Sequence, residues 1–296
     1  MKKIQINNEL LGIFYMLLAQ FSFATNDAIV KVIYLNYSNI LVLNQVIFLR
    51  GIFALILIGI FLILTKKFDL KLIFSSTKLK LRGLLESVAT ICFFIGVAKL
   101  PFAMVYVLIS LAPIFLTAFG ALFLNEKVRW KRWSAVFLGF IGLVIVVEPN
   151  ELKFGYYFIF PLLTAVFITI REIVTKQIED NFHSEQIAFI TCFVVTIFFG
   201  ILSLFQFFIF DLKEFVLLFI SSLFLSFGYF FSVATIKVAL VSATSTFRYS
   251  VILWGIVYGY FLFNEVPKVN TYIGGLIIVI SGLIIITRQK QLGKIK

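Results

Sequence analysis

Two stretches decide the fold of this 296-residue chain: APIFLTAFGALFLNEKVRWKRWSAVFLGFIGLVIVV (residues 112–147) and SVILWGIVYGYFLFNEVPKVNTYIGGLIIVISGLIIIT (residues 250–287). The second stretch repeats the pattern of the first. The matching positions are Asn125–Glu126 with Asn264–Glu265, Gly142 with Gly282, and Asp27 and Lys31 with Glu172 and Lys176. The spacing predicts two repeats, an N-terminal one over residues 1–149 and a C-terminal one over residues 150–296.

The composition places both repeats in a lipid bilayer. Hydrophobic residues make up 61% of the chain and charged residues 14%, whereas about 25% of a typical soluble domain is charged. This excludes a soluble globular protein and a disordered chain. Apolar runs long enough to cross a membrane predict an all-α polytopic membrane protein of ten transmembrane helices, at residues 10–34, 40–65, 80–99, 101–124, 132–148, 155–178, 186–210, 214–236, 240–263 and 270–287.

Five helices per repeat is an odd number, so the second repeat must enter the membrane from the opposite side. Two similar halves of opposite orientation imply a pseudo-twofold axis in the membrane plane, and this inverted repeat suits alternating access to a central site. The alternative is a duplication that serves packing alone.

The basic residues set the orientation. Most of the 26 Lys and Arg residues lie before the first predicted span, after the last, or in alternate connections such as residues 66–82 and 127–132. By the positive-inside rule both termini are cytoplasmic. The net charge of +12 is then a topology signal that meets anionic headgroups, and we expect no nucleic-acid partner. Cys92 and Cys192 lie in apolar runs, and one histidine, His183, predicts no metal site.

The segment SLAPIFLTAFGALFLNEKVRWKRWSAVFLGFIGLVIVVEP (residues 110–149), with Pro113, Asn125–Glu126 and Gly139-x-x-Gly142, resembles the core of EamA-type members of the drug/metabolite transporter superfamily, and Arg50 in FLRGIFAL fits too. Within it, ATNDAIVK (24–31), LRGLLESVATICFF (81–94) and ATSTFRYSVILWGIVYGYFLFNEVP (243–267) are most similar to S-adenosylmethionine carriers of obligate intracellular bacteria. The resemblance implies a secondary active transporter in the bacterial inner membrane that takes up or exchanges S-adenosylmethionine. Thr246-Phe247-Arg248-Tyr249 departs from the expected Pro-Tyr-Arg-Tyr, and Glu86 is a second departure.

Ionisable residues within membrane helices are costly and mark pathways or partners. We expect the cargo to contact Asn26, Asp27, Glu86, Tyr106, Arg248, Tyr249 and Trp254, and gates or ion pairs to involve Lys31, Arg171, Glu172, Glu126 and Glu265. Asp27 would attract a cationic group, and Arg248 would clamp a carboxylate.

Structural alternatives stand beside these roles. Asp27 and Lys31, four residues apart, can pair with each other, and Arg248 can pair with Glu86. Glu86 can instead pair with Arg82, and we favour structural pairing for Arg50. Glu172 and its neighbours can form an ion pair beside the headgroups, and the aromatic residues can serve packing.

Several function classes remain after the sequence is read. Export or import of amino acids, riboflavin-like metabolites or drugs is the alternative cargo, and sequence does not give direction. An integral membrane enzyme would need a nucleophile–base or metal cluster, and none has usable spacing. A channel would need a repeated pore lining. No nucleotide-binding loop is present, so we expect no cofactor, a small-molecule substrate, and transport energy from gradients.

Overall fold

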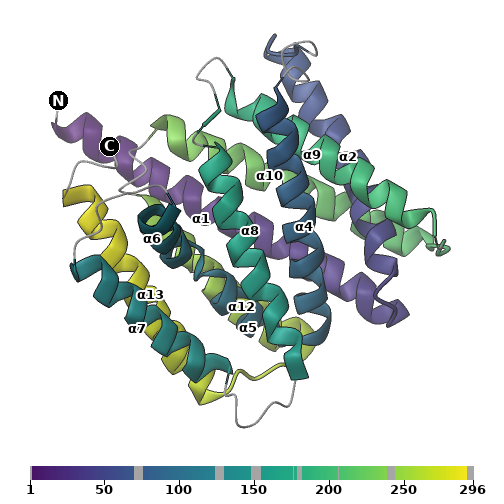
Figure 1. Ribbon diagram of the computed structural model, residues 1–296. Helices are drawn as coiled ribbons and strands as arrows, with labels where there is room; N and C mark the ends of the chain where they lie inside the picture. Colours follow the sequence, from purple (N-terminus) through teal and green to yellow (C-terminus); the bar gives the residue numbers. More distant parts are fainter. Residues whose placement is uncertain are drawn as a thin grey trace.

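The computed structural model describes residues 2–69, 76–123, 130–147, 155–175, 177–178, 182–205, 207–238 and 244–291, and all regular structure within these ranges is helical (Figure 1). The elements are α1 (Lys2–Tyr37), α2 (Val42–Leu64), α4 (Thr77–Lys99), α5 (Phe102–Ile109), α6 (Ala112–Phe123), α7 (Trp130–Val147), η1 (Gly155–Phe158), α8 (Ile159–Thr175), α9 (Ser184–Ser203), α10 (Leu212–Val238), η2 (Ser245–Tyr249), α12 (Ser250–Phe263) and α13 (Val269–Gln291).

Seven segments are long and apolar enough to cross a membrane: Leu10–Tyr37, Val42–Leu64, Thr77–Lys99, Phe102–Phe119, Gly155–Thr175, Glu185–Ser203 and Leu212–Ser232. Shorter apolar helices follow at Trp133–Val147, Phe247–Phe263 and Val269–Ile285. Large apolar side chains on the outer surface, such as Ile63 and Phe137, are more than half exposed. These features are those of a multi-pass membrane protein, as the composition predicts.

The helices pack in matched pairs. Helix α1 lies along α10, and α4 lies along α8. At the flanks, α2 pairs with α9 on one side of the bundle and α7 with α13 on the other (Figure 1). The paired helices run antiparallel: the Thr235 hydroxyl of α10 donates to the Gly12 carbonyl near the start of α1, and Asn36 near the end of α1 donates to Glu214 near the start of α10.

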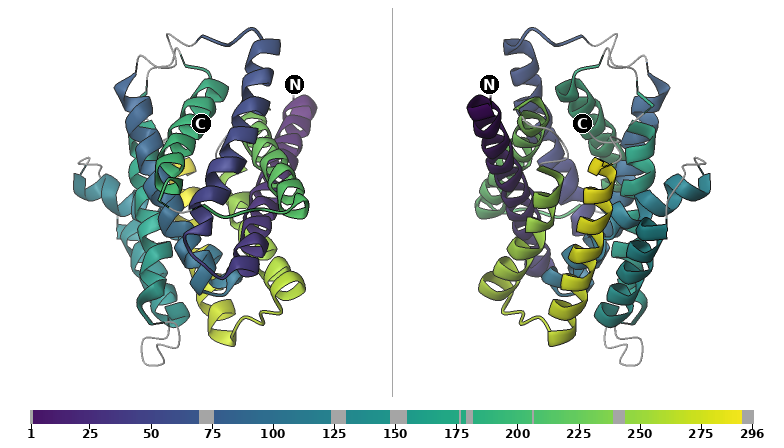
Figure 2. Two further views of the ribbon diagram at one scale, coloured as in Figure 1. Left: turned by 90° about the vertical axis from the view of Figure 1, so that its right-hand side faces the viewer. Right: turned by 90° about the vertical axis from the view of Figure 1, so that its left-hand side faces the viewer.

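Two faces of the bundle can be defined from these contacts. We call the face at which α1 begins the N-terminal face, uppermost in Figure 2, and the face at which α1 ends the opposite face. Lys78 at the start of α4 donates to the Gln177 carbonyl just after α8, and Lys67 after α2 pairs with Glu185 at the start of α9. Helix α8 therefore ends at the N-terminal face and runs opposite to α1, and α13 also ends toward this face (Figure 2).

Two predicted spans are not continuous helices. The predicted helix over residues 101–124 divides into α5 and α6 at Ser110–Leu111. The cause is Pro113, because its ring excludes a helical carbonyl at residue 109, where α5 ends. The predicted helix over residues 240–263 likewise contains the 3₁₀ turn η2 before α12. Ser and Thr dominate the sequence of residues 242–246, and both residue types are unfavourable in a helix interior.

Glycines bring the backbones of α7 and α13 together. A Cβ atom on Gly142 would lie 2.8 Å from the carbonyl oxygen of Gly274, and one on Gly274 would lie 2.6 Å from the carbonyl oxygen of Gly142. Small residues at facing positions are the usual means of close helix association in lipid. This contact joins the last helices of the two repeats predicted from the sequence.

Candidate functional site

Asp27 lies at mid-depth in α1 and is partly exposed. It stands ten residues before Tyr37, the end of α1, which corresponds to roughly 15 Å along the helix axis, about half the hydrocarbon thickness of a bilayer. Its Oδ2 accepts a hydrogen bond of 2.8 Å from the Tyr106 hydroxyl of α5, and its Oδ1 accepts one of 2.8 Å from the Asn26 amide. A carboxylate has about four acceptor positions, so two remain for another donor.

Asn26 differs from the prediction, because its side chain is buried among protein partners rather than presented to a cargo. It is 2% exposed, and its Oδ1 accepts from Arg50 Nη1 at 3.0 Å and from the Ser221 hydroxyl at 2.8 Å. The Arg50 guanidinium of α2 is buried and lies 5.4 Å from the centre of the Phe94 ring. Asn26 therefore joins α1 to α2 and α10, and the structural role expected for Arg50 is confirmed.

Lys31 and Glu265 form an ion pair at the opposite face, with 2.6 Å between Lys31 Nζ and Glu265 Oε1. Lys31 is 4% exposed, donates to the Leu100 carbonyl at 3.3 Å, and lies 4.7 Å from the centre of the Phe263 ring. The second carboxylate oxygen of Glu265 accepts the Phe102 backbone N–H at 2.5 Å, at the first turn of α5. We call these groups the clasp; they hold α1, the end of α4, the start of α5 and the end of α12 together.

The clasp contradicts one predicted pairing, and it joins Lys31 to Glu265, two of the residues expected in gates or ion pairs. The alternative in which Lys31 pairs with Asp27 is wrong, because Lys31 turns to Glu265, where a carboxylate, a carbonyl and two aromatic rings surround the ammonium group. The pairing of Glu265 with the other half of the chain is present. Its repeat counterpart, Glu126, lies outside the described residues.

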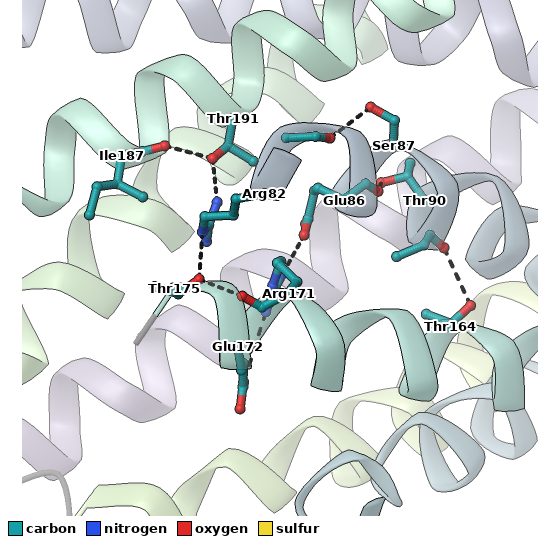
Figure 3. A network of polar contacts seen from close by, with 12 residues as sticks. Arg82, Glu86, Ser87, Thr90, Thr164, Arg171, Glu172, Thr175, Ile187 and Thr191 are labelled. Carbon is teal, nitrogen blue, oxygen red and sulfur yellow. Dashed lines mark hydrogen bonds and ion pairs between the residues drawn. The ribbon is translucent and has the colours of Figure 1, made fainter. Parts of the chain in front are cut away.

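A second group of charges, drawn in Figure 3, lies toward the start of α4 and the end of α8, which are both at the N-terminal face. Arg171 of α8 forms an ion pair with Glu86 of α4, and its Nη2 lies 3.9 Å from Glu172. Arg82 Nε donates to the Thr175 hydroxyl at 3.0 Å, and Arg82 Nη1 donates to Thr191. We call Arg82, Glu86, Arg171, Glu172 and Arg248 the arginine network. The predicted pairing of Glu86 with Arg82 or Arg248 is wrong, because Glu86 pairs with Arg171 across the close α4–α8 contact. Its contact with the cargo stays a prediction.

Arg248 is the exposed member of this network. It lies in the turn η2, and its Nη1 is 3.5 Å from Glu172 Oε1, with 47% of the Arg248 side chain exposed. Three guanidinium groups and two carboxylates make up the network as defined, so its formal charge is positive. An exposed guanidinium in a positive cluster is suited to bind an added carboxylate through two parallel hydrogen bonds.

The three predicted aromatic residues lie in different surroundings. Tyr106 is 2% exposed, and its ring packs on Gly255, while its hydroxyl donates to Asp27. Tyr249 is corrected: it is 8% exposed, and its hydroxyl abuts Gly282 of α13, where a Cβ atom could not fit. Trp254 is partly exposed and contacts Phe21 edge to face, with 4.8 Å between ring centroids.

The sequence interpretation missed several polar contacts. Ser221, Thr175 and Thr191 each contact a charged or amide side chain from another helix. Thr25 of α1 shares a hydrogen bond of 2.5 Å with the Tyr258 hydroxyl of α12. Isolated hydroxyls in apolar helices were the available signal, but a hydroxyl can always bond to the carbonyl four residues earlier, so the sequence does not show which ones reach another helix.

Several bacterial transporters are similar to this chain in sequence. An S-adenosylmethionine uptake transporter of Rickettsia conorii is 27% identical over 95% of this chain and 94% of its own length, and one of Rickettsia prowazekii is 28% identical over 71% of this chain and 72% of its own. The pseudopaline exporter CntI of Pseudomonas aeruginosa is 25% identical over 95% of this chain and 97% of its own.

A solved crystal structure matches with a TM-score of 0.62 at 13% identity and covers 97% of this chain and 99% of that chain, which shows a shared fold. The model of the EamA-like transporter family matches twice, over residues 10–148 and 153–287. Nearly the whole chain is covered by these two matches. The protein is therefore a multi-pass membrane transporter, and it belongs to the EamA-like transporter family.

Proposed function

We propose that this protein is a secondary active carrier of S-adenosylmethionine in the bacterial inner membrane, working by alternating access. Ten membrane spans form two inverted repeats, residues 1–149 and 150–296, with both termini in the cytoplasm. Three observations support this architecture: the family model matches each half separately, α1 and α8 run in opposite directions, and basic residues such as Lys66, Lys67 and Lys78 gather at the N-terminal face.

The observation that carries the proposal is the arrangement of charge along the axis of the bundle. A partly exposed carboxylate, Asp27, lies at mid-depth between a closed ion pair at the opposite face and a positive network nearer the N-terminal face. A carrier needs a central site with a barrier on either side, and inverted repeats supply the two barriers. The Lys31–Glu265 clasp is the outer barrier, and the Arg171–Glu86 pair with Glu172 belongs to the inner one.

The cargo assignment rests on complementary charge and on the named relatives. Both Rickettsia relatives are named for uptake of S-adenosylmethionine. S-adenosylmethionine carries a sulfonium, an ammonium and a carboxylate, so it presents both signs of charge. Asp27 would bind the cationic part, and Arg248, the exposed guanidinium, would bind the carboxylate. Trp254 of α12 and Phe21 of α1, whose ring centroids lie 4.8 Å apart, offer an aromatic surface to the adenine ring.

Counterflow in proteoliposomes tests both parts. Vesicles loaded with unlabelled S-adenosylmethionine should accumulate the labelled compound, and Asp27→Asn and Arg248→Gln should each abolish this accumulation. Thr235→Ala is the matched control, because it removes a hydroxyl contact between α1 and α10 far from the site. Normal counterflow by Arg248→Gln would remove Arg248 from the site. If the unmodified protein exchanges an amino acid or riboflavin but not S-adenosylmethionine, the cargo assignment is refuted and the assignment as a carrier stands.

A further inference from the structure

Asp27 has a counter-ion that does not touch it. Arg50 and Asp27 lie on opposite sides of the Asn26 amide: Arg50 Nη1 donates to Asn26 Oδ1 at 3.0 Å, and Asn26 Nδ2 donates to Asp27 Oδ1 at 2.8 Å. Among the described residues, no direct ion pair links Arg50 to Asp27. This arrangement places a positive charge behind the carboxylate while leaving the exposed side of the carboxylate available.

The orientation of the Asn26 amide follows from its neighbours. A guanidinium only donates and a carboxylate only accepts, so the amide oxygen must face Arg50 and the amide nitrogen must face Asp27. The Ser221 hydroxyl donates to the same oxygen at 2.8 Å and fixes the amide from a third helix. The amide dipole thus points its positive end at Asp27, in the same sense as the field of Arg50.

We propose that Asn26 is a spacer that prevents Arg50 from neutralising the cargo-binding carboxylate. The inference rests on the proposed role of Asp27 as the group that binds the cationic part of the cargo. With the spacer in place, Arg50 leaves the remaining acceptor positions of Asp27 to Tyr106 and the cargo. Without the spacer, the long Arg50 side chain closes on Asp27 as a direct ion pair, and the cargo must displace it.

The surroundings of Arg50 make this closure feasible. Its guanidinium is held on one face by the Phe94 ring and by a single hydrogen bond to a side chain, and its Nε has no hydrogen-bond partner among the described residues. An arginine whose one side-chain acceptor is removed turns to the nearest carboxylate, because a buried unpaired charge is costly. Arg50 and Asn26 are therefore positioning residues for Asp27 rather than cargo contacts.

The spacer hypothesis makes an unusual prediction about a pair of variants. Asn26→Ala should raise the KM for S-adenosylmethionine in proteoliposome counterflow at least tenfold with a smaller change in the maximal rate. Adding Arg50→Gln should restore the KM to within about threefold of the unmodified protein. A purely structural role for either residue predicts the reverse, in which the double variant is worse than Asn26→Ala.

Controls separate this proposal from misfolding and from the proposed function. Ser221→Ala removes one donor to Asn26 but keeps Arg50 in place, so its KM should change little, and thermal unfolding of each purified variant checks the fold. If Asp27→Asn transports normally, the proposed role of Asp27 fails. If Asp27→Asn is inactive but the double variant is no better than Asn26→Ala, the spacer alone is refuted.

Discussion

Replacing Glu265 should open the opposite face of the carrier. The Glu265→Ala change leaves the Lys31 ammonium 4% exposed without its carboxylate and leaves the Phe102 backbone N–H without its side-chain acceptor. Removing one partner of a buried ion pair costs about 3–5 kcal/mol. The Glu265 side chain is 23% exposed, so we take the lower value, about 3 kcal/mol, because water screens part of the loss.

The lost backbone contact adds to this destabilisation. A side-chain cap on a helix N-terminus contributes about 1 kcal/mol, so the closed state should lose about 4 kcal/mol in total. If the clasp exists only in the closed state, the ratio of open to closed molecules should rise roughly a thousandfold, since about 1.4 kcal/mol corresponds to a factor of ten. Glu265→Gln removes the charge but keeps one acceptor oxygen, so it retains one of the two hydrogen bonds. Its effect should therefore be smaller, about 2 kcal/mol.

Accessibility of a cysteine at the α1–α12 contact measures this shift. Thr25→Cys, in a background with Cys92 and Cys192 replaced by alanine, places the only thiol where Thr25 contacts Tyr258. A membrane-impermeant maleimide added to spheroplasts should label this thiol faster in Glu265→Ala than in the parent. Lys67→Met is the matched control, because it removes an ion pair of 3.0 Å at the other face, between α2 and α9.

Two outcomes would refute the reasoning. One is a labelling rate in folded Glu265→Ala equal to that of the parent, which would mean that the clasp does not hold the face closed. The other is an equal increase in Lys67→Met, which would mean that labelling reports general loosening. The double change Lys31→Met with Glu265→Gln should label more slowly than Glu265→Ala, because it leaves no buried charge unpaired.

Two further predictions concern packing between the halves. Gly142→Ala or Gly274→Ala should lower the free energy of unfolding by about 1–3 kcal/mol, because each new methyl group meets a backbone oxygen of the facing helix at 2.8 or 2.6 Å. The measurement is the melting temperature, and an unchanged value would contradict the close α7–α13 contact. Gly282→Ala should be destabilising because its Cβ atom overlaps the Tyr249 ring, and adding Tyr249→Ala should cost less than the sum of the two single changes; strict additivity would contradict the contact.

The all-helical membrane fold could be predicted from the sequence because it depends on local hydrophobicity, whereas the ten spans and the two repeats stay predictions. The family resemblance drawn from residues 110–149 is confirmed by the family model. The break at Ser110–Leu111 was harder to predict from Pro113. A proline in a membrane helix either kinks the helix or ends it, depending on whether neighbouring groups satisfy the backbone groups that it frees. The turn η2 contains no proline. The Ser and Thr residues at 242–246 disfavour a helix interior but do not specify a 3₁₀ turn.

Pairing of charges was harder to predict because it depends on how helices distant in sequence face each other. Lys31 lies one helical turn from Asp27, and that spacing alone favours a local pair. The structure gives Lys31 a partner 234 residues away, because the end of α12 and the start of α5 meet there. Glu86 likewise has Arg82 one turn away but pairs with Arg171 of α8.

These pairings have one consequence for the mechanism. Among the described residues, Lys31 pairs with Glu265 and Glu86 pairs with Arg171, and both pairs join residues 1–149 to residues 155–291. Such pairs hold one arrangement of the halves and must be exchanged for others when the halves move. Asp27 and Arg248 are partly exposed and only partly satisfied by the protein, so an incoming group of either charge finds its partner there. If the proposed site is right, a cargo that carries both charges finds a partner for each of them, whereas a simple cation or anion finds a partner at one residue only.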